Sequence, residues 1–315
     1  MQKNGGIGMN LRKWAMFLLP AACLGLAGCG MPGASSNRVV YANFDDADGF
    51  CSQIRAAFDQ KAKADGIEVT YLDAKGSGNM QIDQMNDAIS SGAGAIVLLA
   101  ADGTSIVKSI EKANDAGIPV IIVNRSVAGG KVLRAFSDDK EAGRMQGEYM
   151  AKHLPEGAKI VYLQGDGTQS SAVGRWEGFK EACLDKRPDI QLLSFVDAGW
   201  SKAEALKTMT LWMSMFPEIN GVVAGNDEMA LGAVQALKGA NRLEGCLISG
   251  VDATPAGLAA VTAGEMVQTV KQDAKGQGEA ALTLAEGFIK GNPPSSDTSI
   301  PFTSITQENI GQVGN

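Results

Sequence analysis

The sequence predicts an α/β protein of two doubly wound parallel-sheet lobes, and three observations lead to this fold class. A short apolar run rich in Val, Ile and Leu recurs along the chain, and each run is followed by a polar turn and an amphipathic helix. The runs are continuous rather than alternating, which is typical of parallel strands buried on both faces. At least eight such units in 315 residues exceed one comfortable sheet, so two domains are expected.

The expected elements follow from this pattern. The expected strands are residues 38–44, 67–72, 95–100, 119–123, 159–164, 190–196, 220–225 and 246–251. Helices between them carry apolar stripes at helical spacing, namely Ile54, Ala57, Phe58 and Lys61, then Ile82, Met85 and Ile89, then Ile106, Ile110 and Ala113. The loop at 126–143 and the Pro/Ser-rich segment at 291–301 are expected to connect the lobes.

The N-terminal residues form an export signal rather than a fold element. Residues 9–29, "MNLRKWAMFLLPAACLGLAGC", have a basic start, an apolar run too short for a membrane span, and small residues before Cys29. The last four residues resemble a bacterial lipobox, so residues 1–29 are interpreted as a lipoprotein signal peptide with Cys29 lipidated. A plain secretory signal cut nearby is the alternative. Residues 30–37 are expected to be a flexible tether.

Composition and motifs argue against two other classes of protein. The net charge of -7 and pI of about 4.9 disfavour a nucleic-acid partner. An enzyme with a Ser/His/Asp triad would need His153, which is the single histidine and follows a helical stretch. Neither G-x-S-x-G nor a cysteine spacing typical of metal sites occurs, and Cys51, Cys183 and Cys246 are interpreted as buried thiols. A glycoside hydrolase that uses Asp46, Asp48 or Asp252 stays open.

Polar and aromatic side chains follow the expected strands, where the carboxyl ends of a doubly wound sheet bind ligands. They are Asp45, Asp46, Asp48, Phe50, Asn124, Arg125, Asp166, Arg175, Asp197, Trp200, Asn226, Asp227 and Asp252. Amide, carboxylate and guanidinium groups offer the planar hydrogen bonding that adjacent sugar hydroxyls match, while an aromatic ring covers the apolar C–H face. A helix cap is the competing interpretation for Asp46, Asp102 and Asp227. We expect Asn226 to open on a cleft and Asp227 to cap the next helix.

With these residues assembled, the chain resembles the type I periplasmic sugar-binding proteins, the ribose-binding and galactose/glucose-binding group. The likeness covers about residues 38–300 and is most specific in "NDEMALGA", "GVDATPAG", "GRWEGF" and "TVKQD", with support from "VNR" and "AGW". The resemblance implies a type I periplasmic-binding-protein fold whose two lobes are joined by three hinge crossings. It places these crossings near Ser137-Asp138, Gln272-Asp273 and Ser295–Ile300. The implied lobes are 38–137 plus 273–296, and 138–272 plus 297–315.

The resemblance also implies the ligand-binding residues. Phe50 and Trp200 match the aromatic walls. The polar contacts implied are Asp48 or Asp46, Asn124, Arg125, Arg175, Asn226, Asp252 and Gln272. Cys51 departs from the second aromatic of ribose-type relatives, and the segment "HLPEGAKIVYL" lacks an acidic calcium loop, so neither a metal nor another cofactor is expected.

The function implied is that of an extracytoplasmic solute-binding protein of an ABC-type importer, which is not an enzyme. Its ligand is expected to be a hexose, a pentose or an inositol, and its main partner the membrane permease. Presentation of the sugar to a chemoreceptor or sensor kinase is the alternative. We further expect a monomer in the periplasm or at the cell surface, anchored to the membrane through Cys29, that binds no nucleic acid. A sugar-responsive repressor would need a helix-turn-helix in place of the signal segment.

Overall fold

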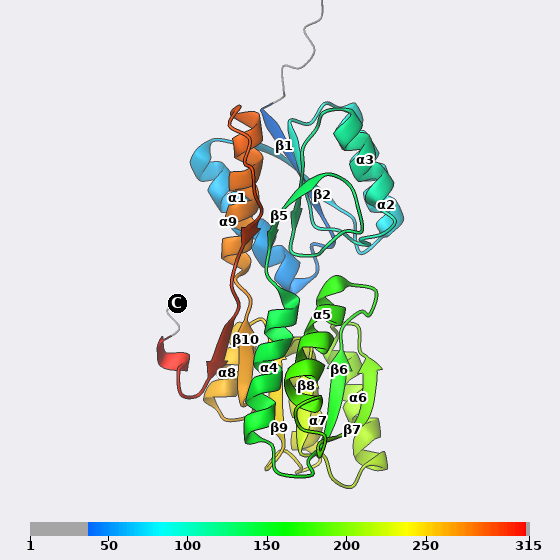
Figure 1. The fold of residues 1–315 in the computed structure, drawn as a ribbon, viewed down its shortest axis with the longest axis vertical. Helices are drawn as coiled ribbons and strands as arrows, with labels where there is room; N and C mark the ends of the chain where they lie inside the picture. The colour runs from blue at the N-terminus through cyan, green and yellow to red at the C-terminus, as the bar shows by residue number, and fades with distance from the viewer. Residues whose placement is uncertain (1–36, 313–315) are drawn as a thin grey trace, which may run out of the picture. The chain divides into compact units, whose positions relative to one another are not determined.

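The structure, a computed structural model, describes residues 37–312, which form two α/β lobes with one six-stranded sheet each (Figure 1). The expected signal peptide, Cys29 and residues 30–36 of the tether lie outside the described residues. The predicted fold class is confirmed, and each of the eight expected strands is present.

The first sheet has the strand order β2-β1-β3-β4-β5-β11, and all its pairs are parallel. Its strands are β1 (Arg38–Asn43), β2 (Glu68–Asp73), β3 (Ala95–Leu98), β4 (Val120–Val123), β5 (Val132–Phe136) and β11 (Thr298–Ser299). Its helices are α1 (Gly49–Asp65), α2 (Gly78–Ser90), α3 (Val107–Asp115) and α9 (Ala274–Ile289).

The second sheet repeats this order as β7-β6-β8-β9-β10-β12, with β12 alone antiparallel to its neighbour. Its strands are β6 (Lys159–Gln164), β7 (Gln191–Asp197), β8 (Gly221–Ala224), β9 (Leu247–Val251), β10 (Gln268–Lys271) and β12 (Thr303–Thr306). Its helices are α4 (Asp139–His153), α5 (Ser170–Phe179) with a π-helical continuation (Lys180–Leu184), α6 (Lys202–Met215), α7 (Asp227–Gly239) and α8 (Pro255–Thr262), and a 3-10 turn (Ile310–Gln312) follows β12.

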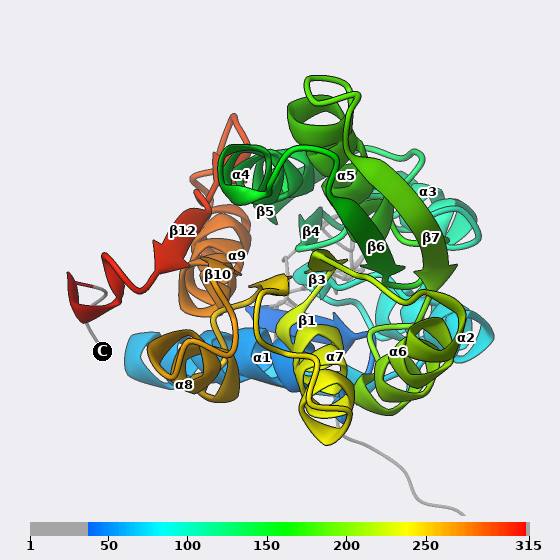
Figure 2. The same cartoon turned by 90° about the horizontal axis from the view of Figure 1, so that it is seen from below.

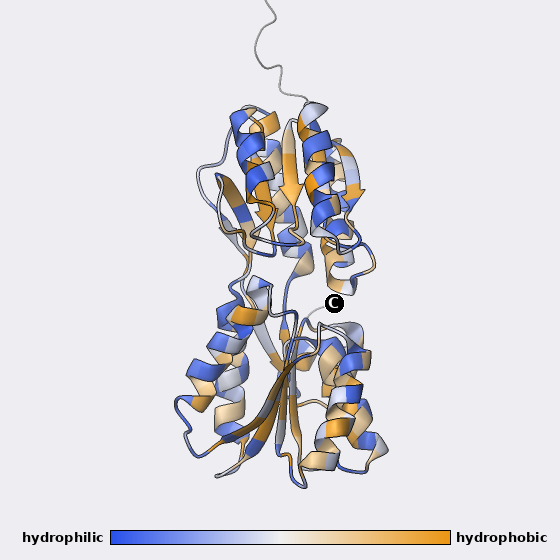
Figure 3. Ribbon diagram, turned by 90° about the vertical axis from the view of Figure 1, so that its right-hand side faces the viewer, coloured by the Kyte–Doolittle hydropathy of each residue, from blue (hydrophilic) through white to orange (hydrophobic). Residues whose placement is uncertain are grey.

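Each central strand is buried on both faces, as the continuous apolar runs predict. In β1, Val39 and Tyr41 pack under α1 and α9, while Val40 and Ala42 pack under α2 and α3. Figure 2 shows the second lobe in the same way, with α6, α7 and α8 on one side of the sheet and α4 and α5 on the other. Figure 3 shows the apolar residues gathered on the strands and the polar ones on outer helix faces.

The connection expected at 126–143 contains β5 and the start of α4, which were not predicted as elements. The strand was missed because its apolar run is short and contains Arg134, and because Gly129 and Gly130 just before it indicate a loop. Strand β10 was missed because it is polar: Gln268 is fully buried and donates to Ser304 Oγ (2.8 Å) and to the Met145 carbonyl (3.1 Å). Within residues 37–312, no helix is long and apolar enough to cross a membrane.

The chain passes between the two lobes three times. After β5 it enters α4 at Ser137-Asp138, and after β10 it returns to α9 at Gln272-Asp273. The last expected boundary, between 296 and 297, is displaced because Thr298–Ser299 pairs with β5 of the first sheet. The third crossing therefore follows β11, between Ile300 and Phe302, before β12 joins the second sheet.

Candidate functional site

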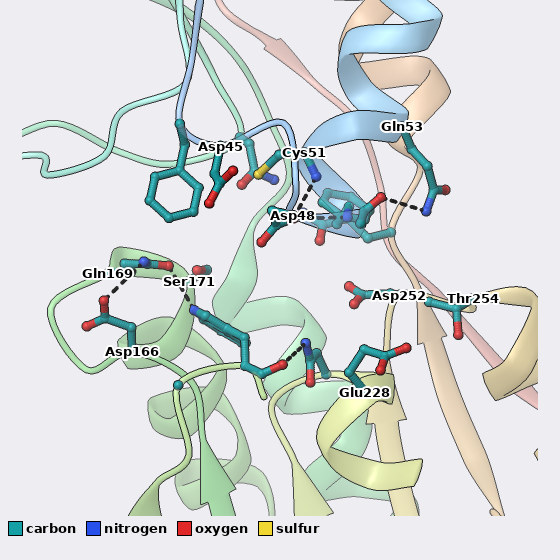
Figure 4. A pocket seen from close by; sticks show the side chains of 18 of the residues that line it. Asp45, Asp48, Cys51, Gln53, Asp166, Gln169, Ser171, Glu228, Asp252 and Thr254 are labelled. Atoms are coloured by element: carbon teal, nitrogen blue, oxygen red, sulfur yellow. Dashed lines mark hydrogen bonds between the residues drawn. The ribbon is translucent and has the colours of Figure 1, made fainter. Parts of the chain in front are cut away.

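The carboxyl ends of both sheets border one cavity of about 860 Å³. Loops after β1 and β6, next to the point where each strand order reverses, lie at its wall, which is where doubly wound sheets bind ligands. All nine side chains predicted from the sequence line it: Asp48, Phe50, Asn124, Arg125, Arg175, Trp200, Asn226, Asp252 and Gln272. Figure 4 shows Asp45, Asp48 and Cys51 facing Asp166, Gln169 and Asp252 across this cavity.

Arg175 is held in the cavity wall by three hydrogen bonds. It projects from α5, is 4% exposed, and donates from Nε to Asp139 Oδ1 (3.0 Å), from Nη1 to the Gly225 carbonyl (2.7 Å), and from Nη2 to Gln272 Oε1 (2.8 Å). A guanidinium has five N–H groups, so one on each Nη atom is left to donate to a ligand. The rigid fork therefore presents two donors in fixed directions.

Gln272 and Asp252 complete this side of the cavity. Gln272 is 4% exposed, and among the described residues its Nε2 has no hydrogen-bond acceptor. An unpaired buried donor is costly, so this amide is suited to a ligand oxygen. Asp252 has a positive φ of 119°, and its Oδ1 lies 3.9 Å from Arg175 Nη1. Burial raises the pKa of Asp252 well above its ordinary value, although the charge of Arg175 opposes the rise.

Trp200 forms an apolar wall that depends on two glycines. A Cβ at Gly165 would lie 2.2 Å from indole carbons, and one at Gly225 would lie 3.2 Å from the ring, so the indole lies against bare backbone. Its Nε1 donates to Gln169 Oε1 (2.9 Å), and the Arg175 guanidinium carbon lies 5.5 Å from the ring centroid. The ring orientation is thus fixed, with its polar edge satisfied inside the protein.

The first lobe contributes a matching pair from the loop after β4. Asn124 has a positive φ of 68° and donates from Nδ2 to Gln277 Oε1 (3.1 Å). Arg125 is 7% exposed, donates to the Ala100 carbonyl (3.3 Å), and its guanidinium lies 4.0 Å from the centroid of the Phe44 ring. Phe44 therefore fixes the arginine by a cation–π contact, and both side chains line the cavity.

Asp46 and Asp48 differ in their partners and in their position relative to the cavity. Asp46 pairs with Arg55, accepts from Asn43 Nδ2 (2.6 Å), and does not line the cavity. The competing interpretation of Asp46 as the helix cap is therefore wrong. The N-cap of α1 is Asp48, whose Oδ1 accepts from the amides of Phe50 (2.9 Å) and Cys51 (2.8 Å). Asp48 also faces the cavity, so it stays the candidate of the two for a ligand contact.

Comparison with known proteins identifies the family. The profile described as "periplasmic binding protein domain" matches residues 39–293. The chain belongs to the periplasmic binding proteins. It is 32% identical to a xylitol-binding protein of Mycolicibacterium smegmatis over 92% of this chain and 84% of that protein.

Two further comparisons place the chain in the ribose-binding group of these proteins. The ribose import binding protein of Escherichia coli is 27% identical over 95% of this chain and 100% of that protein. A solute-binding protein of an ABC transporter from Bacillus halodurans, solved with bound myo-inositol, superposes with a TM-score of 0.83 at 32% identity, covering 89% of this chain and 98% of that one. The group consists of type I sugar-binding proteins, which agrees with the resemblance seen in the sequence.

In this periplasmic binding protein, Asn226 borders the cavity as expected, but it also takes the helix-capping role that the sequence suggests for Asp227. Asn226 is the N-cap of α7, because its extended backbone lets Oδ1 accept from the Met229 amide (2.9 Å), and it still borders the cavity. Asp227 lies inside the first helical turn and is fully buried. It accepts from Thr269 Oγ1 (2.7 Å) and from the Thr254 amide (2.8 Å), so it ties α7 to strand β10 and to the loop after β9 that carries Asp252.

Several residues of the cavity were missed or left unassigned by sequence reasoning. Asp45, Asp166 and Asp197 line it and follow strands, so the position rule found them without giving them a role. Phe44, Gln53, Gln169, Ser171, Glu228 and Thr254 also line it. Phe44 directly follows β1 and could have been found by the same rule. Gln169 offered no such signal, since it lies in the turn before α5, five residues beyond β6.

Asp227 is expected to make folding stability depend on pH between about 4 and 6. Burial raises its pKa to about 6 from the ordinary 3.8, so the folded protein binds a proton more tightly than the unfolded chain. Stability from this group therefore increases as the pH falls through 6. At about 1.4 kcal/mol per tenfold change in proton affinity, the whole effect is about 3 kcal/mol. Urea unfolding should be compared between wild type and Asp227→Asn. Between pH 7 and pH 4 the free energy of unfolding of wild type should rise by about this amount relative to that of the variant.

Asp102→Asn is the matched control, because the contribution of Asp102 to stability should depend on pH with the opposite sign. Asp102 is exposed, and hydrogen bonds from the amides of Ser105 and Thr104 lower its pKa. Its contribution is therefore present at neutral pH and lost in acid. An Asp227→Asn profile parallel to wild type across this range would contradict the assignment.

Proposed function

We propose that this protein binds one neutral monosaccharide or cyclic polyol in the cavity and delivers it to the permease of an ABC importer. One observation carries the proposal: planar hydrogen-bonding groups from both lobes surround one cavity beside the Trp200 ring. Asn124 and Arg125 come from the first lobe, and Arg175 and Asn226 from the second. Such groups match vicinal hydroxyls, while the indole would cover the C–H face of the ring.

The charges around the cavity favour a neutral ligand. Its lining contains six acidic side chains, Asp45, Asp48, Asp166, Asp197, Glu228 and Asp252, against the guanidinium groups of Arg125 and Arg175. Even without Asp252, whose pKa is raised by burial, the acidic groups outnumber the basic ones by five to two. A sugar acid or sugar phosphate would add like charge to this set, at a cost of desolvation and repulsion. Hydroxyl groups can donate to the carboxylates and accept from the guanidinium and amide groups at the same time.

Binding without catalysis agrees with the position of the candidate catalytic groups. His153 lies at the exposed end of α4, where Nδ1 contacts the Tyr149 carbonyl (2.7 Å) and the two rings stack. Of the three carboxylates considered for glycoside hydrolysis, Asp46 is outside the cavity lining, whereas Asp48 and Asp252 belong to it. The relatives are binding proteins, among them xylitol-, ribose- and myo-inositol-binding members. We therefore propose that the bound sugar leaves chemically intact.

The place of action is extracytoplasmic, as in the relatives. We propose in addition that Cys29 is lipidated, which would hold the protein at the membrane near its permease. A single acyl chain binds membranes only weakly, so the diacyl form of a lipoprotein would be the stable anchor. Mass spectrometry of protein extracted from membranes should show the lipid on Cys29. In a second test, a Cys29→Ser variant should appear in the soluble fraction.

Thermal unfolding with a ligand panel tests the sugar assignment. We expect myo-inositol, xylitol or ribose to raise the midpoint, since a ligand at a hundred times its dissociation constant adds about 2.7 kcal/mol. Trp200→Ala should abolish most of this shift because it removes the apolar wall. Gluconate should give no shift, for the charge reason above.

Two outcomes would contradict the proposal. The first is the absence of a shift with every neutral sugar and polyol of the panel. The second is chemical conversion of the ligand, detected by mass spectrometry after incubation, which would favour a hydrolase.

A further inference from the structure

The cavity residue Arg175 touches all three crossings between the lobes. Its partner Asp139 directly follows the first crossing, and its partner Gln272 belongs to the second. The Phe302 ring, at the end of the third crossing, has its centroid 5.9 Å from the guanidinium carbon. One buried guanidinium thus bonds to the second crossing and to the residue that follows the first, and it lies near the ring at the end of the third.

Asn124 makes an equivalent connection from the first lobe. Its Nδ2 donates to Gln277 Oε1 (3.1 Å), and Gln277 Nε2 donates to Ser137 Oγ (2.9 Å). Gln277 lies in the first turn of α9, just after the second crossing, and Ser137 lies in the first crossing. Gln277 is fully buried and Ser137 is 3% exposed, so both bonds are shielded from water.

The bonds Asn124–Gln277–Ser137 form a first-lobe relay, and those of Arg175 to Asp139 and Gln272 form a second-lobe relay. Each relay connects one lobe's cavity residue to the crossings. The first-lobe relay ends at Ser137, and the second-lobe relay ends at Asp139, two residues further on. Asp139 and Gln277 do not border the cavity. They can therefore act on a ligand only through Arg175 and Asn124, whose directions they fix.

We propose that Asp139 and Gln277 are positioning residues that couple the ligand-facing Arg175 and Asn124 to the segments on which the lobes turn. A ligand that bonds to both side chains then fixes the crossings as well as the cavity wall, so the liganded state stays closed longer. Hinge residues of this kind absorb the backbone change of closure. The ligand part of this inference rests on the proposed function, whereas the link from Gln277 to the crossings does not.

Hydrogen exchange of the ligand-free protein tests the link without any sugar. Gln277→Met keeps the side-chain volume but removes both hydrogen bonds. We expect amides in peptides covering 134–142 and 268–276 to exchange at least fivefold faster than in wild type. Gln81→Met is the matched control, because Gln81 is also fully buried and fully bonded, to the carbonyls of Asn43 (3.3 Å) and Leu99 (2.9 Å), but touches no crossing. Unchanged exchange at the crossings, or the same acceleration in all peptides, overturns the inference.

Stopped-flow fluorescence with myo-inositol tests the coupling to ligand, with Trp200 in the cavity as reporter. Gln277→Met and Asp139→Asn should each raise the dissociation rate at least fivefold while changing the association rate less than twofold. A substitution that only lowers stability would reduce the fraction of active protein and leave both rates unchanged. Unchanged rates in these variants would therefore overturn the coupling. If Gln277→Met does not fold, Ser137→Ala removes one bond of the same relay and must show the same two effects. If wild type does not bind myo-inositol, the choice of ligand fails, and the exchange experiment alone decides the inference.

Discussion

Replacement of Arg175 by alanine is expected to lower the free energy of unfolding by about 3–5 kcal/mol and the ligand affinity at least a hundredfold. The loss of stability arises because the buried partners of Arg175 remain in the protein without it. Asp139, whose side chain is 11% exposed, and Asp252, whose side chain is 8% exposed, would keep their burial but lose their counter-charge. The Gly225 carbonyl and Gln272 Oε1 would lose their donors as well.

The loss of affinity has a separate cause. Removal of the fork takes away the two N–H groups that make no hydrogen bond within residues 37–312, and it frees Gln272 to rotate away from the cavity. Arg175→Lys separates the two effects, because an ammonium keeps the charge but cannot bond in three fixed directions. We expect this variant to recover part of the stability and little of the affinity.

Urea unfolding and isothermal titration with the best sugar of the panel measure these quantities. Purified protein should be compared at pH 7, where Asp227 is largely ionised in wild type and in both variants. An Arg175→Ala protein within 0.5 kcal/mol of wild-type stability would contradict the assignment of Arg175 as the counter-charge of the two carboxylates.

The fold and most of the cavity could be predicted because they depend on local signals. Buried parallel strands need apolar side chains on both faces, so β1, β3, β6 and β8 are visible as continuous runs. Chain topology then brings the residues that follow these strands to one edge of each sheet. For this reason the sequence alone places Asn124, Arg125, Trp200 and Asn226 at the cavity.

What could not be predicted depends on partners far apart in the sequence. Asp46 and Asp48 are equivalent by position, and only Arg55 and the α1 amides separate them. The partners of Arg175 lie 36, 50 and 97 residues away. Gln277 was not a candidate, since a glutamine near a helix start has many interpretations until its contacts with Asn124 and Ser137 are seen.

The close packing of α4 on α5 is the feature on which the position of Arg175 depends. A Cβ built on Gly143 of α4 would lie 1.9 Å from the Arg175 carbonyl oxygen, and one on Gly178 of α5 would lie 1.9 Å from the Lys140 carbonyl oxygen. Both contacts are with backbone, so no rotamer change can relieve them. The two glycines let the helices approach until Arg175 reaches both Asp139 and Gln272.

Gly143→Ala is therefore expected to lower the free energy of unfolding by about 3 kcal/mol, near the upper end for overpacking, and to weaken ligand binding by moving Arg175. The matched control is Gly239→Ala, at the end of α7, where a Cβ would meet no atom within 4 Å. There the same substitution should stabilise by about 0.5–1 kcal/mol, because alanine favours the helix more than glycine does. If urea unfolding shows that Gly143→Ala destabilises the protein and Gly239→Ala stabilises it, the loss is due to the contact between α4 and α5. A stabilised Gly143→Ala protein that binds its sugar normally would show that α4 and α5 can separate without moving Arg175.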